Sequence, residues 1–137
     1  MKLLITAFLL VLLFFGCSEK KAPDKDQEKA LLDEVIKVHD EVMGADEHLM
    51  KNKMLLDSLA KASVNVDSAK AYSTQLTLAD SAMSTWMHKF DVENTGKTHE
   101  QIMTYLDAQK KEISKVKVQI NTALSASDTY LKKVKSK

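Results

Sequence analysis

Apolar residues recur along most of this chain in alternating steps of three and four, the spacing that places side chains on one face of a helix. The first series lies within residues 27–62 and runs through Leu31, Val35, Val38, Val42, Ala45, Leu49, Asn52, Leu56 and Leu59. Its one polar member is Asn52, and a buried amide of this kind fixes the register of packed helices at some cost in stability. Gly44 costs about 1 kcal/mol relative to Ala within a helix and favours a kink or a split there. Because the repeat passes through Gly44 in phase, we expect one continuous helix.

Two further segments carry the same spacing. The second is expected to span about residues 67–92, with core positions Ala69, Tyr72, Leu76, Ala79, Met83, Trp86 and Phe90. The third is expected to span about residues 98–135, with core positions Ile102, Leu106, Gln109, Ile113, Val116, Ile120, Ala123, Ser127, Tyr130 and Val134. Short links place consecutive helices antiparallel. The sequence therefore predicts an all-α fold, an elongated antiparallel three-helix bundle with coiled-coil-like packing over residues 27–136.

The ends of the predicted helices carry their own signals. Thr98, with Gln101 three residues later, has the spacing of a capping box for the third helix. Asn94 and Gly96 tolerate the positive φ that often ends a helix, here the second one. The middle helix is shorter than its neighbours, so one end of the bundle lacks a third partner, and a second copy of the chain is one way to fill that gap.

The densest core layer is expected in the middle helix, within residues 79–90. This segment holds the only Trp of the chain, Trp86, and Phe90 follows it by four residues, so both lie on one face of the helix. We expect truncation of either side chain to Ala to cost about 3 kcal/mol or more.

The first residues follow a different pattern. An apolar run from Leu3 to Phe15, interrupted only by Thr6, follows Lys2 and ends in a polar stretch. The run is shorter than the roughly 20 apolar residues that span a bilayer. This is typical of a signal peptide rather than a permanent membrane helix, so we expect residues 1–16 to be a cleaved signal peptide.

The pair Gly16-Cys17 resembles the lipobox of bacterial lipoproteins, in which a small residue directly precedes a Cys that is lipidated. Phe14 and Phe15 stand where the usual pattern has Leu and a small residue. The resemblance implies cleavage before Cys17 and attachment of two or three acyl chains such as palmitate, which suffice for stable anchoring. A flexible tether over residues 17–26 would follow. The expected location is the cell envelope, in the outer membrane of a Gram-negative bacterium.

The charge balance bears on the kind of partner. The chain has 20 basic and 19 acidic residues, and 19 of each remain when Lys2 of the signal peptide is left out. Nucleic-acid binders usually show a basic excess with clustered Arg, whereas this chain contains no Arg. We therefore expect no nucleic-acid partner.

No sequence motif of a catalytic site is visible. The chain lacks a Gly-x-Ser-x-Gly motif and a glycine-rich phosphate loop, and His99-Glu100 is not followed by the second His of a zinc-protease helix. Its one Cys is Cys17, so once this thiol is lipidated the chain has neither a disulfide nor a Cys metal ligand. We expect no enzymatic activity and no catalytic residues.

Three pairs of side chains with metal-binding groups have the four-residue spacing of a helix face: His39 with Met43, Met83 with Met87, and His99 with Met103. If the helices fold back about links near residues 64 and 95, all three pairs fall in the layer of Trp86. Thioether and imidazole ligands suit a soft ion such as Cu(I), and His/Met ligation also occurs for haem. The simpler interpretation is that Met fills irregular gaps around a bulky Trp, that both His lie at the core edge and that no cofactor is bound.

The pattern His39-Asp-Glu-Val-Met43, together with Ala79-Asp-x-Ala-Met83-x-x-Trp86-Met87-x-x-Phe90, is similar to a group of small helical bacterial lipoproteins. Some of these carry the label viral A-type inclusion protein. The resemblance covers most of residues 30–107 and implies a helical, membrane-tethered protein without an assigned active site.

These patterns favour a lipid-anchored helical bundle of the cell envelope that acts as a structural or protein-interaction module. It would hold the membrane through the lipid on Cys17 and contact a protein partner or another copy of itself. The alternative hypothesis is an envelope protein that binds copper or haem through the His and Met side chains named above.

Overall fold

The computed structural model describes residues 21–62 and 66–136. The expected signal peptide of residues 1–16, the lipidation site Cys17 and the first part of the tether lie outside this part of the chain. Four helices make up the described residues, which contain no strand: α1 (Lys21–Met43), α2 (Asp46–Lys61), α3 (Val66–Lys89) and α4 (His99–Lys135). The all-α helical bundle predicted from the apolar spacing is therefore confirmed.

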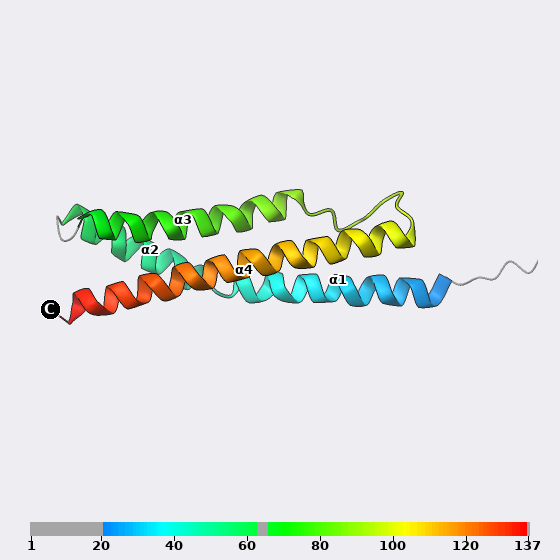
Figure 1. Cartoon of the computed structure of the whole chain (residues 1–137), viewed down its shortest axis with the longest axis horizontal. Helices are drawn as coiled ribbons and strands as arrows, with labels where there is room; N and C mark the ends of the chain where they lie inside the picture. Colours follow the sequence, from blue (N-terminus) through cyan, green and yellow to red (C-terminus); the bar gives the residue numbers. More distant parts are fainter. Residues whose placement is uncertain (1–20, 63–65, 137) are drawn as a thin grey trace, which may run out of the picture.

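The helices form an elongated bundle in which the chain passes along the long axis three times (Figure 1). α1 and α2 together make the first pass, α3 returns, and α4 makes the third pass. Ion pairs join Glu34 to Lys110 and Glu41 to Lys117, and each pair is 76 residues apart in sequence. This constant separation shows that α1 runs parallel to α4. With 37 residues, α4 extends over roughly 55 Å at 1.5 Å per residue.

The expectation of one continuous first helix is wrong, because the chain leaves the helical path at Gly44 and Ala45. The Gly44 amide still donates to the Asp40 carbonyl at 2.9 Å, but the Ala45 amide donates only three residues back, to the Val42 carbonyl, at 2.9 Å. Glycine has a low helix propensity, so a change of direction costs less here than elsewhere. The apolar repeat hides the break, since buried residues recur every seven positions on both sides of it: Val35, Val42, Leu49 and Leu56.

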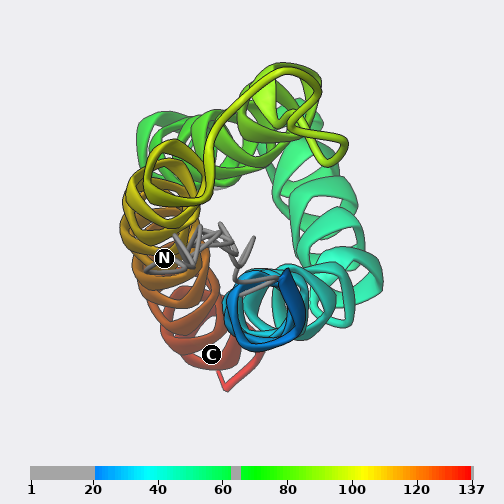
Figure 2. The ribbon, with the colours of Figure 1, turned by 90° about the vertical axis from the view of Figure 1, so that its right-hand side faces the viewer.

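The break changes the partner of the first pass. α1 packs chiefly against α4, whereas α2 packs against α3 and, less extensively, against α4. An end-on view shows this redirection, with α2 swinging away from the axis of α1 toward α3 (Figure 2). At the level of the break the chain therefore passes from one packing partner to another.

The start of α1 differs from the sequence prediction, whereas the signals between residues 94 and 101 agree with it. α1 begins at Lys21, earlier than the expected residue 27, and the helix therefore includes part of the segment expected as a tether. The capping box is confirmed, since the Thr98 side chain accepts from the Gln101 amide and the Gln101 side chain accepts from the Thr98 amide. Asn94 has φ 51° and Gly96 has φ 78°, so the link between α3 and α4 uses the residues that the sequence pointed to.

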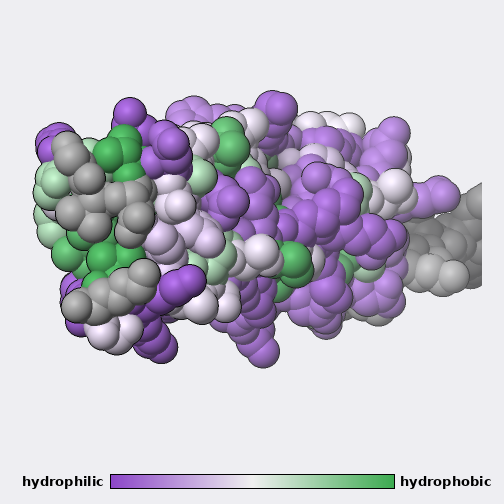
Figure 3. Space-filling model, turned by 60° about the vertical axis from the view of Figure 1, so that its left-hand side comes forward, coloured by the Kyte–Doolittle hydropathy of each residue, from purple (hydrophilic) through white to green (hydrophobic). Residues whose placement is uncertain are grey.

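The core is mainly apolar, and the buried polar residues of the described part of the chain are Asn52, Ser73, Asn94 and Ser127. Its fully buried side chains include Leu56, Leu76, Leu106, Ile113 and Val35. Within the described residues, no helix combines the length and the apolar character needed to cross a membrane. The face shown in Figure 3 is largely hydrophilic, and its apolar surface gathers at the end of the bundle opposite the start of α1.

Candidate functional site

The aromatic layer predicted around Trp86 is present. The rings of Trp86 and Phe90 stack with centroids 4.7 Å apart, and the ring of Phe90 continues to Tyr105 at 6.2 Å. Trp86 is buried and Phe90 is half-buried. The Trp86 Nε1–H is buried and has no hydrogen-bond partner within the described part of the chain.

His39 lies at the edge of this layer. Its ring centroid is 6.0 Å from that of Trp86, and its Nδ1 lies 2.9 Å from the Asp40 carboxylate. A carboxylate oxygen only accepts hydrogen bonds, so Nδ1 carries the proton in this contact. That assignment leaves Nε2 as the only nitrogen with which His39 could bind a metal.

Three of the six predicted metal ligands meet at a small cavity beside the break. Met43 comes from the end of α1, and Met83 and Met87 come from successive turns of α3. The cavity has a volume of about 80 Å³. Its wall also includes Val42, Asp46, Leu49, Asp80 and Ile120.

The other predicted pair lies elsewhere. His99 Nδ1 is 2.8 Å from the Glu28 carboxylate near the start of α1, and its Nε2 is 4.0 Å from that of Asp24. Met103 follows one turn later on α4 and is partly buried. The structure therefore separates His99 and Met103 from the methionine cavity.

The separation follows from the register of α1 and α4. Ion pairs at a sequence offset of 76 place His39 level with residues near 115, which lie about 24 Å along α4 from His99 at 1.5 Å per residue. The expectation of a single layer assumed that α3 and α4 are in register about residue 95. The rings of Tyr72 and Tyr130 lie 4.8 Å apart, so the two helices are in register about residue 101, and Met83 lies beside Ile120 rather than beside Met103.

The volume of the cavity also bears on haem. One water molecule occupies about 30 Å³ in the liquid, so about 80 Å³ accommodates an ion with a few small ligands. A porphyrin does not fit in this space, so this packing does not support the haem hypothesis.

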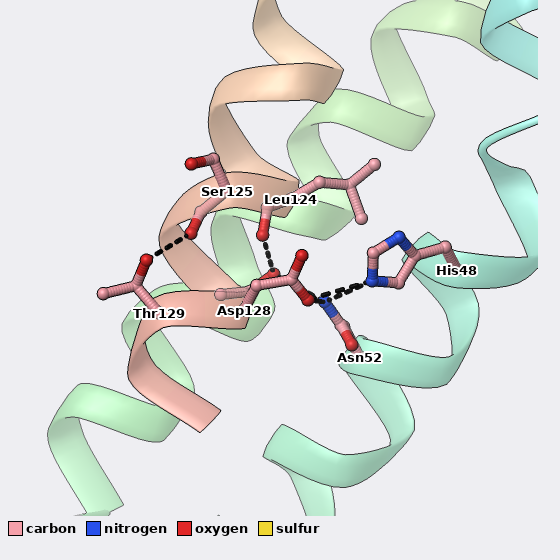
Figure 4. Close-up of polar contacts among 7 residues, drawn as sticks. His48, Asn52, Leu124, Ser125, Asp128 and Thr129 are labelled. Carbon is pink, nitrogen blue, oxygen red and sulfur yellow. Dashed lines mark hydrogen bonds and ion pairs between the residues drawn. The ribbon is translucent and has the colours of Figure 1, made fainter. Parts of the chain in front are cut away.

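A second polar group ties α2 to α4 near the far end of the bundle (Figure 4). The Asn52 amide donates to the Ser127 hydroxyl at 2.9 Å and to the Asp128 carboxylate at 2.7 Å. His48 Nε2 lies 2.9 Å from the same Asp128 oxygen. The buried Asn52 therefore has two acceptors on the neighbouring helix, as expected for a residue that fixes register.

The network was partly visible in the sequence. Asn52 and Ser127 both stand at predicted core positions, and the structure brings them together. The contributions of His48 and Asp128 were missed, because an exposed side chain beside the core has no periodic signal. The one available clue was that His48 precedes Asn52 by four residues and so shares its helix face.

The chemistry of this network is structural. Ser127 is fully buried and donates to the Leu124 carbonyl at 2.8 Å, so its hydroxyl is not in contact with the imidazole as a nucleophile would be. Burial alone would raise the pKa of Asp128, but the hydrogen bonds from Asn52 and His48 outweigh it and lower the pKa below its ordinary value of 3.8.

The comparisons with known proteins add no relative. No family model, no curated protein and no solved structure matches this chain. Within residues 21–62 and 66–136, no three or more His, Cys, Asp or Glu side chains gather as a metal-binding group. The fold therefore defines the class, an all-α helical bundle, and the methionine cavity and the Asn52 network are its two distinctive sites.

Proposed function

We propose that this protein is a lipid-anchored helical bundle of the cell envelope, held in the outer membrane of a Gram-negative bacterium, that works as a protein-interaction module. The lipobox-like pair before and at Cys17 supports the anchor. The amphipathic helices support a rigid body that presents side chains away from the membrane.

The observation that carries the interaction role is the outer face of α2. Met50 is 50% exposed and Met54 is 64% exposed, one turn apart on the same face. Both line a shallow groove of about 810 Å³ along α2, together with charged side chains such as Lys51 and Asp57. Methionine is enriched at protein interfaces, and its flexible side chain adapts to a partner surface.

Metabolic labelling with a tagged fatty acid tests the anchor. The wild-type chain should carry the label and appear in the membrane fraction, and Cys17→Ala should lose both. Absence of label from the wild type, or label retained by Cys17→Ala, would contradict lipidation.

Photo-crosslinking in intact cells tests the contact face. A photoreactive residue at position 54 should give a discrete crosslinked species. The matched control is Val118 on α4, which is also 64% exposed and apolar, and the same residue placed there should give none. Equal crosslinking from both positions, or none from position 54, would remove α2 as the contact face. Sedimentation of the purified chain then separates a second copy from a different partner.

A further inference from the structure

We propose that this protein has a binding site for one Cu(I) ion, with the side chains of Met43, Met83 and Met87 as its ligands. The other predicted ligands, His39, His99 and Met103, are not part of this site. This site is independent of the α2 contact face. The proposal differs from the six-residue set predicted from the sequence, because the structure brings only these three thioethers together at one cavity.

The backbone gives the three sulfurs a route to one point. Met83 and Met87 are four residues apart on α3, so their side chains share one helix face. Met43 is the last residue of α1, at the turn where the first pass leaves α4 for α3. Each Met side chain has three rotatable bonds, so small rotations suffice to direct three thioethers at a common ion.

The exposures of the three side chains suit an ion that enters from solvent. All three side chains line the cavity, where Met83 is only 4% exposed, whereas Met43 and Met87 are each 40% exposed and so accessible from solvent. The cavity volume of about 80 Å³ is enough for one ion. Met50 and Met54 have the same four-residue spacing but lie on α2 without a third thioether among the groove residues.

The rest of the wall selects the kind of ion. Thioethers are soft, neutral ligands that favour Cu(I) over Zn(II), Mg(II) or Ca(II). Val42, Leu49 and Ile120 make the inner wall apolar and keep water from the ion. Asp46 and Asp80 also line the cavity, and their negative charge offsets the single positive charge that three neutral ligands leave on Cu(I).

Anaerobic competition against a coloured Cu(I) chelator tests the site. The protein is the full chain with Cys17→Ser, so that a thiolate does not compete with the thioethers. It should remove one equivalent of Cu(I) from the chelator and leave Zn(II) with its own indicator. No transfer of Cu(I), or equally tight binding of Zn(II), would overturn the proposal.

Matched variants then identify the ligands. Met43→Leu, Met83→Leu and Met87→Leu conserve volume, and each should weaken Cu(I) binding about tenfold or more. The control Met50→Leu/Met54→Leu and the variant His39→Ala should bind as the parent does. If the control pair loses as much affinity as the three variants, or if His39→Ala loses affinity, this ligand set is wrong.

A spectroscopic readout covers any variant that folds poorly. Silver(I) is a redox-inert stand-in for Cu(I), and its titration should shift the methyl carbon resonances of these three methionines alone among the methionines of the bundle. Shifts at Met50 and Met54 instead would place the ion elsewhere and overturn the proposal.

Discussion

The indole of Trp86 combines the largest side chain of the core with a polar group that is not satisfied. Its ring stacks on Phe90, but its buried Nε1–H has no partner within the described residues. A buried donor without an acceptor costs free energy in the folded state. The contribution of Trp86 to stability therefore comes from its packing, reduced by that cost.

Substitutions at Trp86 should separate these two contributions. Trp86→Ala should lower the free energy of unfolding by about 3–5 kcal/mol, because it leaves a cavity in the core. Trp86→Phe should cost only about 1–2 kcal/mol, since it keeps most of the ring contact and removes the unsatisfied donor. Denaturant unfolding of both variants measures the difference. If Trp86→Ala and Trp86→Phe lowered the free energy of unfolding equally, the Nε1–H of the wild type would be making a favourable hydrogen bond.

Asp128 should make stability depend on pH in the acid range. Its pKa is lowered in the folded state, so its contribution to stability is present above the ordinary value of 3.8 and is lost as the pH falls through the lower folded pKa. The wild type should therefore exceed Asp128→Asn in unfolding free energy at pH 6, and this gap should narrow in more acid solution. Asp33→Asn is the control, because the ion pair of Asp33 is made within its own helix, with Lys29. A gap for Asp128 that stays constant with pH would contradict the assignment.

At the level of single residues, periodicity predicted what is buried better than what it contacts. Val35, Leu76 and Ile113 stand at predicted core positions and are fully buried. Leu124 and Leu131 are also buried, although the strict alternation does not pass through them. A helix that packs in a wide interface also buries residues on either side of its central apolar row. The width of the interface cannot be predicted from the sequence alone.

The break between α1 and α2 shows the corresponding limit for helices. A seven-residue repeat of buried side chains survives a two-residue turn when the turn keeps the register, so the pattern remained in phase across Gly44. The capping box at Thr98 was predictable because it is local, with both hydrogen bonds made within four residues. The break depends on which neighbouring helix each half contacts, and that information is not local.

Gly44 and Gly96 should respond in opposite ways to the same substitution. A Cβ on Gly44 would lie 3.4 Å from the Asp40 carbonyl oxygen, an ordinary contact, so Gly44→Ala should raise the free energy of unfolding by about 0.5–1 kcal/mol. Gly96 has φ 78°, a conformation that is strained for a residue with a Cβ, so Gly96→Ala should lower the free energy of unfolding by about 1 kcal/mol. Thermal unfolding of the two variants tests this. A destabilised Gly44→Ala would show that the break requires glycine.

At the scale of the whole molecule, the helices differ in how many neighbouring helices they pack against and in how many of their side chains are buried. α1 packs chiefly on α4, and among its residues 24–43 the buried side chains are Val35 and Val42. α4, in contrast, packs on all three other helices. Regions with few buried contacts open at lower free energy than the global unfolding. α1 is therefore expected to open before the rest of the bundle.

Native-state hydrogen exchange should resolve this order. Amides in the middle of α1 should exchange faster than amides near Ile113 and Ile120 in the middle of α4. Their opening free energies should also show a weaker dependence on denaturant, because a local opening exposes less surface. Equal protection in α1 and α4 would mean that the bundle opens as one unit.

The three-pass layout was predictable from the sequence, but the levels of the side chains were not. The number and order of the passes follow from periodicity and link length, although the first pass consists of two helices. Which residues lie level depends on where each link turns, and the nonhelical stretch between Lys89 and His99 moved His99 away from Met83. Small errors in a link thus become large displacements along a helix, since each residue adds 1.5 Å.

An odd number of passes makes this bundle a spacer with two unlike ends. The start of α1 lies at the same end of the bundle as the link between α3 and α4, while the end of α4 lies at the opposite end, where α2 ends and α3 begins (Figure 1). An attachment made before α1 therefore leaves the last helical turn of α4 roughly 55 Å away. A fluorescent label on Ser136 would report from one end of the rod, and a label on Glu100, exposed in the first turn of α4, from the other, so energy transfer between them measures the length of the spacer directly.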